Sequence, residues 1–471
     1  MTKTRFGFGA VAAVMVLVMG ASGSAHAATY YVNAAATNDN GNGSLSSPKK
    51  YISSGIALMS TNGGDILIIA PGTYGNALDA ITTVRNGVAG RYNTIKADVD
   101  GGVVITRGLD VPSSAQYLRF EGLKWDTTGT SFGKSIKGHH IKFLRCAFKG
   151  GPGTGNTTNL SVGTNDRTPG AQYILLEDVW AYGLGGRYNI IVYNSDKVIV
   201  RRAVVRHDGG WTNTSGDPEA GITVYNSSDT LIQNSIVLDS DLAYSNWEKA
   251  FYNVKNASSS NPHSNGVIVG SIALNNVGYA YGYDDVGPIQ NASISNSVAW
   301  ATGGGVAVGG GTGGGHAVAV TGMTVGNTSG HAFANWGNGG STLAVSHSIA
   351  FNNSGNAFLN VGAHSYNNCN GNGTNCSGTG EVSYSPLANG LRYLPRIEAG
   401  TTLKTGGQGA TQIGAELVKR IGVSGTLHGE SGYDSVTDED LWPWPNEARI
   451  RAGGVEKDVT LVETDEAGDD V

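Results

Sequence analysis

The stretch VIVRRAVVRHD at residues 198–208 has three later counterparts in the chain that can be laid over it. They are LIQNSIVLDSD (231–241), VIVGSIALNNV (267–277) and SISNSVAWATG (293–303). Isoleucine and valine recur at alternate positions within these stretches, which is typical of strands with one buried face. The chain is therefore expected to fold as short strands that repeat along its length.

Aligning these stretches places one residue of each in a common column that continues in both directions along the chain. The members of this column are Arg145, Glu177, Arg202, Ser235, Ser271, Ser297, Gly322 and Ser348. Successive members are 32, 25, 33, 36, 26, 25 and 26 residues apart. A base period near 25 residues therefore recurs, and the longer intervals carry insertions.

A second strand repeats within the units, as NIIVYNS (189–195), GITVYNS (221–227) and YGYDDVG (281–287). Short strands, corners rich in Gly and Asn, and this period fit a coil of three strands per turn, with turns stacked about 4.8 Å apart. We therefore expect an all-β fold, a right-handed parallel β-helix, over residues 28–390. Asn234 and Asn296 are expected to join a ladder of stacked amides. A β-propeller would need longer repeats and closed radial symmetry.

The composition excludes several other classes of protein. Of 471 residues, 72 are glycine and only 14% are charged, which argues against helical bundles and coiled coils. No Gly-X-Y period is present, so a collagen-like chain is excluded. The net charge is −6 without a basic run, so we expect no nucleic-acid partner.

The N-terminus has the features of an export signal. Lys3 and Arg5 precede an apolar run from Phe8 to Met19, and Ala25-His26-Ala27 is a small-residue cleavage site. We expect residues 1–27 to be a signal peptide and the protein to be secreted, to the periplasm, the extracellular space or the cell surface. No stretch is long enough to span a membrane, and we expect a monomer.

The cysteines and the C-terminal region carry further expectations. Cys369 and Cys376 suit a small disulfide loop in an oxidising compartment, whereas Cys146 is expected to be buried as an apolar residue. Residues 391–471 depart from the repeat and end in an acidic tail, so they are expected to form an irregular cover. Within it, Trp442 and Trp444 either pack over the last turn or form a platform for sugar stacking.

The order of motifs in the region that follows the signal peptide resembles that of a known group of proteins. A Tyr30-Tyr31-Val32 strand leads through a polar loop to Pro48, a helix near Ile52 to Met59, and then Gly64-Asp65. An apolar strand at Ile66 to Ile69 and Pro71-Gly72-Thr73-Tyr74 follow. This order resembles the N-terminal segment of the pectate-lyase-like superfamily of secreted β-helix proteins. The resemblance implies a helix that caps the open end of the coil.

The insertions indicate where a site would lie. They follow Lys149, Asp208 and Asp241. Each insertion begins at the same distance after its column residue, so the inserted loops are expected to project from one side of the coil and to form the walls of a groove. In the aligned register Arg206 stacks on Asp239, and Asp208 stacks on Asp241. Two stacked carboxylates would raise one pKa or recruit a cation.

Other charged and aromatic residues join this candidate site. The adjoining loops and a later turn contribute Trp211, Asp217, Glu219, Glu248, Lys249, Asp284 and Asp285. Asp284-Asp285 replaces the Asn-Ser of the earlier repeat, as a calcium ligand, an acid pair or a solvated corner. Glu177 and Arg202 are interpreted as a surface ion pair between neighbouring strands. The structural histidines are expected to be His140, His263, His316 and His347.

Three functions remain open. A polysaccharide lyase acting on a uronate polymer would use Lys249, His207 or Arg206 as base, with Ca²⁺ held by Asp208, Asp239 and Asp241. Its substrate would be bound by Trp211, Asp217, Glu219, Glu248, Asp284 and Asp285. An inverting glycoside hydrolase would use a pair of carboxylates, with Asp208/Asp241 and Asp284/Asp285 as candidates, although the chain lacks the Gly-His-Gly and Arg-Ile-Lys of polygalacturonases. The Gly-rich turns at 303–320 instead favour a non-catalytic glycan-binding or structural protein.

Overall fold

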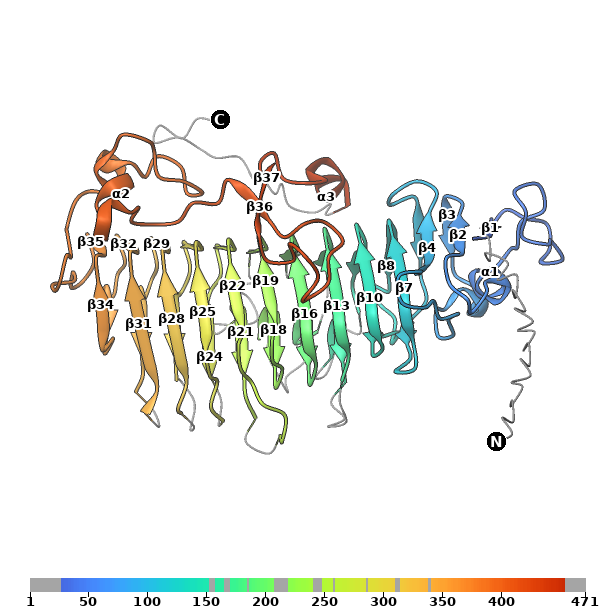
Figure 1. The fold of residues 1–471 in the computed structure, drawn as a ribbon, viewed down its shortest axis with the longest axis horizontal. Coiled ribbons are helices and arrows are strands. Elements are labelled where there is room, and N and C mark those ends of the chain that lie inside the picture. The colour runs from blue at the N-terminus through green and yellow to red at the C-terminus, as the bar shows by residue number, and fades with distance from the viewer. Residues whose placement is uncertain are drawn as a thin grey trace, which may run out of the picture.

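The computed structural model describes residues 27–151, 157–164, 170–183, 186–206, 219–239, 248–256, 259–284, 287–309, 314–337 and 340–453. Its strands form three long parallel sheets that wind around one axis (Figure 1). Most turns of the coil contribute one strand to each sheet, and strand-to-strand crossovers of this kind are right-handed. The expected parallel β-helix is confirmed.

Sheets 1, 2 and 3 are named in the order in which the chain enters them. The 13 strands of sheet 1 are β1 (Thr29–Val32), β2 (Ile66–Ile69), β4 (Asn93–Ala97), β7 (Gln116–Glu121), β10 (His139–Leu144), β13 (Gln172–Glu177), β16 (Asp196–Arg201), β19 (Leu231–Gln233), β22 (Val267–Val269), β25 (Ala292–Ser295), β28 (Ala317–Thr321), β31 (Thr342–Ser346) and β34 (Ala363–Ser365).

The 12 strands of sheet 2 are β3 (Gly72–Tyr74), β5 (Val103–Ile105), β8 (Leu123–Asp126), β11 (Ala147–Lys149), β14 (Trp180–Tyr182), β17 (Val204–Arg206), β20 (Ile236–Leu238), β23 (Ile272–Leu274), β26 (Val298–Trp300), β29 (Thr324–Gly326), β32 (Ile349–Phe351) and β35 (Asn368–Asn370). The 10 strands of sheet 3 are β6 (Leu109–Val111), β9 (Lys134–Ile136), β12 (Thr158–Gly163), β15 (Tyr188–Tyr193), β18 (Ala220–Tyr225), β21 (Lys249–Val254), β24 (Tyr279–Asp284), β27 (Gly304–Val308), β30 (Phe333–Asn335) and β33 (Phe358–Leu359).

Every second residue of a strand faces the inside of the coil, and these inward-facing residues form the core. Stacking of turns places like side chains on one another, so that Phe120 lies on Phe143 at 4.5 Å and Trp125 on Phe148 at 5.4 Å between ring centroids. These four side chains are fully buried. The period-2 pattern of the sequence therefore predicted the strands correctly.

The strand pairing next to the corner between sheets 1 and 2 differs by one residue from the register that the sequence alignment assumed. Val200 pairs with Ile232, both in the core, whereas the alignment had placed Val200 opposite Gln233. A slip of one residue turns every side chain of a strand to the other face, so the buried pattern sets the pairing. As a result, Ala203 and not Arg202 lies opposite Ser235, whose hydroxyl accepts the Ala203 N–H at 3.2 Å.

The spacing also differs by one residue at four other steps of the alignment, which are Arg145 to Glu177, Glu177 to Arg202, Ser297 to Gly322 and Gly322 to Ser348. Glu177 faces Arg201 and not Arg202, and the residue that follows Ser297 in its stack is Met323 and not Gly322. The expected amide ladder also differs, because Gly270 lies between Asn234 and Asn296 in the corner column. Amide pairs form at other corners instead, as from Asn352 to Asn327 at 2.7 Å.

The N-terminal end of the coil is covered by the helix α1 (Ile52–Leu58). Its residues Ile52 and Ile56, with Met59 at its end, are buried next to β1 and β2. This agrees with the helix implied by the resemblance. Such a cover protects strand edges that would otherwise pair with other chains.

The cysteines are as expected. Cys369 and Cys376 form a disulfide, and Cys146 is fully buried in the core. Within the described residues, no helix has the length and apolar character needed to cross a membrane. The predicted signal peptide lies almost wholly outside the described residues.

The C-terminal region is irregular, as expected, and packs along the side of the coil. Its short elements are η3 (Leu387–Asn389), α2 (Thr402–Thr405), η4 (Gln408–Ala410), an antiparallel pair of β36 (Lys419–Ile421) and β37 (Val436–Asp440), and α3 (Glu447–Gly453). Residues 414–453, which we call the C-terminal strap, run back along the corner of sheets 1 and 2 towards earlier turns (Figure 1).

The strap also decides the role of the two C-terminal tryptophans. Trp444 is 3% exposed and belongs to an apolar cluster with Trp180 and Ile236 on the outer face of sheet 2. The indole N–H of Trp442 donates to the carbonyl of Leu417 at 2.7 Å. Both side chains thus attach the strap to the side of the coil, and packing over the last turn was a wrong prediction.

One buried lysine gives the fold a testable dependence on pH. Lys134 is 2% exposed, and its ammonium donates to Thr127 Oγ1 at 2.6 Å and to the Gly150 carbonyl at 2.7 Å. Burial lowers the pKa of Lys134 to about 7, against about 10.4 for an unfolded lysine. Between these values the unfolded chain binds more protons. This group therefore makes the free energy of unfolding rise with pH, by up to about 1.4 kcal/mol per unit.

Denaturant unfolding between about pH 7 and pH 10 measures this slope. We expect the Lys134→Met variant to lose it relative to wild type, whereas Lys404→Met, at a partly exposed ion pair with Glu416, should keep it. Equal slopes in wild type and Lys134→Met would contradict the prediction.

Candidate functional site

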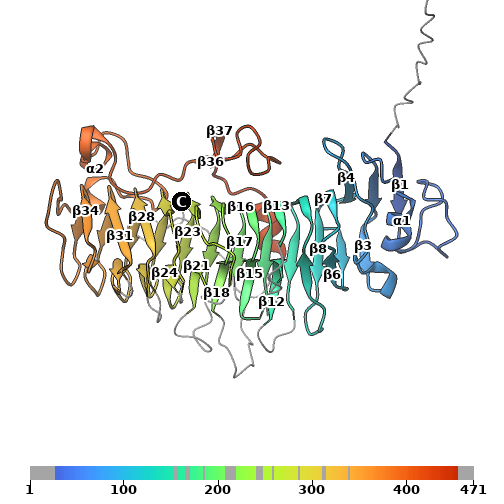
Figure 2. The same cartoon turned by 60° about the horizontal axis from the view of Figure 1, so that its bottom comes forward.

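A groove of about 580 Å³ lies on the outer face of sheet 3. Its floor is formed by strands β9, β12, β15, β18, β21 and β24, which run side by side along the coil (Figure 2). Besides small and apolar residues, the lining consists of four tyrosines and four charged residues. They are Tyr188, Tyr193, Tyr225, Tyr252, Lys137, Arg187, Glu219 and Asp284.

The tyrosines occupy outward positions of neighbouring turns. Tyr193 pairs with Tyr225 in the register of β15 and β18, and their ring centroids are 4.9 Å apart. Tyr188 and Tyr252 are only 6% exposed each, whereas Tyr193 and Tyr225 are half-buried. Aromatic rings with a polar hydroxyl offer an apolar face and a hydrogen-bonding edge together, which suits the alternating C–H and O–H surfaces of a sugar.

A charged cluster lies at one edge of the groove. The Glu219 carboxylate accepts hydrogen bonds from Nε and Nη2 of Arg187. Its Oε1 is 3.8 Å from the ammonium of Lys249. The same ammonium lies 4.5 Å from the centroid of the Tyr252 ring. Lys249 therefore sits beside the groove in contact with two of its lining residues, and 19% of its side chain is exposed.

The next turn leaves the space that this arrangement needs. Gly282 is the outward-facing residue opposite Tyr252. A Cβ at Gly282 would lie 3.1 Å from Lys249 Cγ and 3.1 Å from the ring of Tyr252. Glycine thus permits the lysine and the tyrosine to lean over the neighbouring strand.

The surroundings of Lys249 favour its neutral form. Burial lowers the pKa of Lys249, and the charge of Arg187 adds to this effect, whereas the carboxylates of Glu219 and Asp284 oppose it. Burial likewise raises the pKa of Tyr188, so its hydroxyl stays protonated. The cluster therefore combines an amine that loses its proton more readily than an ordinary lysine with a fixed guanidinium.

The structure brings together three of the residues predicted from the sequence. Lys249, Glu219 and Asp284 meet at the groove. Asp284 lies opposite Val254, in the column of Tyr193 and Tyr225, and not in the column of the asparagines that follow them. Glu248 is 1% exposed and is not among the lining residues.

The predicted stacking of Arg206 on Asp239 is wrong. Arg206 pairs with Leu238, because the strands β17 and β20 are related by one residue less than the alignment assumed. Along β17, Arg206 shares the outward face of Val204, which packs with the C-terminal strap. The Asp239 carboxylate accepts the side-chain amide of Asn275 at 2.9 Å, as part of a corner ladder.

The remaining predicted residues are His207, Asp208, Trp211, Asp217, Asp241 and Asp285, and all lie outside the described residues. Two of the three predicted calcium ligands are among them. In the described part of the chain, the one group of three potential metal ligands is Cys369, Cys376 and Glu381, whose cysteines are joined in the disulfide. Calcium binding therefore stays a prediction.

Sequence reasoning missed the tyrosines and Arg187. Tyr193 and Tyr225 could have been found, because they follow the period-2 pattern of NIIVYNS and GITVYNS on the outward side. Arg187 precedes its strand in a Gly-rich segment without periodicity, and only the fold places it next to Glu219.

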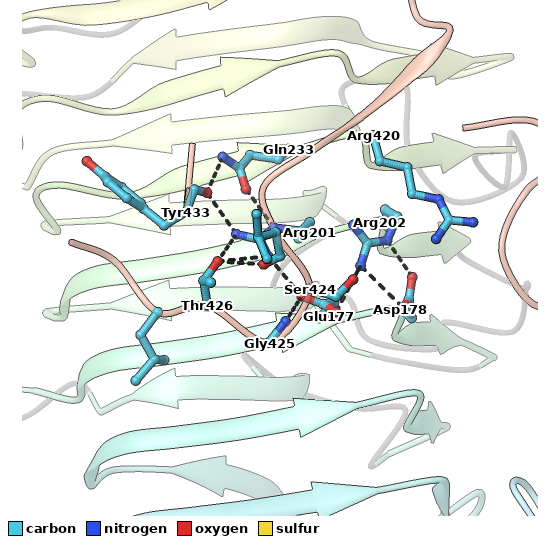
Figure 3. A network of polar contacts seen from close by, with 12 residues as sticks. Glu177, Asp178, Arg201, Arg202, Gln233, Arg420, Ser424, Gly425, Thr426 and Tyr433 are labelled. Carbon is cyan, nitrogen blue, oxygen red and sulfur yellow. Dashed lines mark hydrogen bonds and ion pairs between the residues drawn. The ribbon is translucent and has the colours of Figure 1, made fainter. Parts of the chain in front are cut away.

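A second charged cluster lies on the other side of the coil, under the strap (Figure 3). Glu177 forms the expected ion pair with Arg202, at 2.9 Å, and a further one with Arg201, at 2.9 Å. The side chains of both arginines are fully buried, so the pair is not on the surface as predicted. The strap closes over it, because the Gly425 N–H donates to Glu177 and Ser424 accepts from Arg202.

Comparison with solved structures found several similar chains. The structure is similar to pectate lyase Pel9A, with a TM-score of 0.52 and 16% identity over 82% of this chain and 95% of that one. A GH87 alpha-1,3-glucanase from Streptomyces thermodiastaticus has a TM-score of 0.42 and 12% identity, covering 70% and 65% of the two chains. A mannuronic acid specific family 6 polysaccharide lyase from human gut microbiota has a TM-score of 0.41 and 13% identity, covering 67% and 83%.

No protein-family model matches the sequence, and no curated protein matches it significantly. The likeness to pectate lyase Pel9A is one of fold, a parallel β-helix.

Proposed function

We propose that this pectate-lyase-like β-helix protein cleaves a uronate-containing polysaccharide by β-elimination, with Lys249 as the base. The observation that carries the proposal is the lysine itself. Its amine has a lowered pKa and lies at the edge of a tyrosine-lined groove, next to a guanidinium. The pectate lyase of similar fold adds weight to this choice.

The chemistry requires a neutral amine close to a bound uronate. Lys249 would take the proton from C5, the electrons of that C–H bond would form the C4–C5 double bond, and the C4–O bond would break. The departing oxygen takes up a proton, and the new chain end is an unsaturated uronate. Burial of Lys249 assists the first step, since a base must be unprotonated at the working pH.

Positive charge in the groove suits the carboxylates of the substrate. Lys137 and Arg187 line it, against the two carboxylates Glu219 and Asp284. A uronate bound near Arg187 would gain charge-assisted hydrogen bonds. The same guanidinium would stabilise the charge that develops on the carboxylate as the C5 proton leaves.

A glycan-binding protein without catalysis is the second candidate. The strip formed by Tyr193 and Tyr225 favours it, because stacking surfaces alone suffice for binding. An inverting hydrolase receives less support from the groove. It needs a carboxylate free to act on water, and Glu219 is held by Arg187 and Lys249.

The test is an activity assay on the protein beginning at Ala28. Pectate, alginate and a glycosaminoglycan are offered with and without calcium, while ultraviolet absorbance and reducing ends are followed in parallel. We expect absorbance from unsaturated uronate to grow on at least one polymer. An increase in reducing ends without an increase in absorbance would indicate a hydrolase. If neither signal changes although the protein is folded, a glycan-binding protein without catalysis is favoured. Loss of activity on removing calcium would support the predicted metal.

A further inference from the structure

We infer that the polysaccharide path continues beyond the groove along sheet 3 to Trp336, which stacks on a distal sugar of the same chain. This inference rests on the proposed function, because it takes the groove to hold a polysaccharide. It adds a binding residue that lies outside the groove and makes the protein selective for long chains.

The register of sheet 3 places Trp336 in line with the groove. Asp284 ends β24, and the preceding Tyr283 pairs with Val308, which pairs in turn with Asn335. One position further on, Trp336 thus lies two turns beyond Asp284 in the same outward column. The Trp336 N–H donates to the carbonyl of Val308 at 2.9 Å, which fixes its backbone to the sheet.

Two stacked turns span about 10 Å, a length comparable to a disaccharide unit. The position between Asp284 and Trp336 in this column is Gly309. The neighbouring outward column holds Gly282, Ala307 and Ala334 on successive turns. The side chains in these two columns between the groove and the indole are therefore small, with Ala307 partly exposed and Ala334 buried.

The indole itself is unusual among the tryptophans of the described residues. Trp336 is 42% exposed, whereas Trp125, Trp180 and Trp444 are buried. The ring of His331 meets it edge-on, with centroids 6.1 Å apart and an interplanar angle of 69°. An indole held on one side and open on the other has the geometry of a stacking surface, and its alignment with the tyrosines identifies the same polysaccharide as its ligand.

The test measures binding in the Lys249→Ala background, so that no substrate is consumed. Long chains and trimers of polygalacturonate and of alginate are titrated by calorimetry against this protein with and without Trp336→Ala. We expect Trp336→Ala to weaken binding of the long chain about tenfold, as loss of one stacking contact would, and to leave trimer binding unchanged. Trp336→Tyr should restore most of the affinity.

The matched control is Tyr384→Ala, since Tyr384 is equally exposed at 42% but lies beside sheet 2 at β35. It should leave both affinities unchanged. If Trp336→Ala weakens binding of the trimer and the polymer equally, or weakens neither, the distal contact is refuted. The proposed binding in the groove is unaffected by that result. If the parent protein binds none of these ligands at either length, the proposed function fails for uronates, and the inference fails with it.

Discussion

Replacing Lys249 by alanine is expected to lower kcat/KM on the uronate polymer by about 10²- to 10⁴-fold, the usual contribution of a positioned general base. The side chain contacts Glu219 and Tyr252 at the edge of the groove and is the amine whose pKa burial lowers. The measurement is the initial rate of absorbance growth at several substrate concentrations.

Two further variants separate catalysis from binding. Lys249→Arg keeps the positive charge but supplies no base at neutral pH, because a guanidinium stays protonated. It should therefore be as inactive as Lys249→Ala. Lys404→Ala, which removes an ion-paired lysine on the other side of the coil, should retain wild-type activity. Activity retained in Lys249→Arg would show that this position only binds substrate.

The pH profile carries the same test without a mutation. A base must lose its proton to act, so kcat/KM should rise with pH and level off above the pKa of Lys249. Because burial lowers that pKa, the plateau should begin below the pH at which an ordinary lysine titrates. A profile that falls with rising pH over this range would contradict Lys249 as base.

The second large effect is expected for stability. Glu177→Gln removes the one carboxylate that faces both Arg201 and Arg202 (Figure 3). Asp178 still pairs with Arg202, but Arg201 would keep its charge inside the protein without an ionic partner among the described residues. Breaking a buried ion pair in this way costs about 3–5 kcal/mol, and we expect a loss of that size in the free energy of unfolding.

The strap should loosen together with this network. Arg201 donates to the carbonyls of Val423 and Tyr433, both at 2.8 Å, and thereby holds the strap against sheet 1. Limited proteolysis within residues 414–453 should therefore be faster in Glu177→Gln. The control is Glu439→Gln, at a partly exposed pair with Arg420, where less than about 1 kcal/mol is expected. Equal stability of the two variants would contradict a structural role for the buried pair.

The repeat made the fold predictable, whereas the position of polar residues within it was not. Apolar residues at alternate positions identify strands wherever the chain lies, and turns of similar length must stack. The alignment, however, was anchored on corner residues such as Arg202 and Ser235. It slipped by one, because a corner residue is set by the face of its strand and not by its polarity.

The same distinction applies to the site. Their residue types made Lys249, Glu219 and Asp284 candidates, and the structure brings these three to one groove. The insertions that were predicted to wall a groove lie largely outside the described residues. Glu219 pairs with Arg187, a residue that the sequence had not singled out, since pairing across turns depends on the register of sheet 3.

The parallel β-helix, its N-terminal helix and the disulfide loop could be predicted from the amino-acid sequence, because these depend on periodicity and on residues close together in the chain. The burial of Glu177 and Arg201 and the position of Trp336 in line with the groove became visible in the folded structure alone. The strap that covers Glu177 comes from residues more than two hundred positions later. Contacts of that kind leave no local pattern, because they depend on where the coil brings distant segments together.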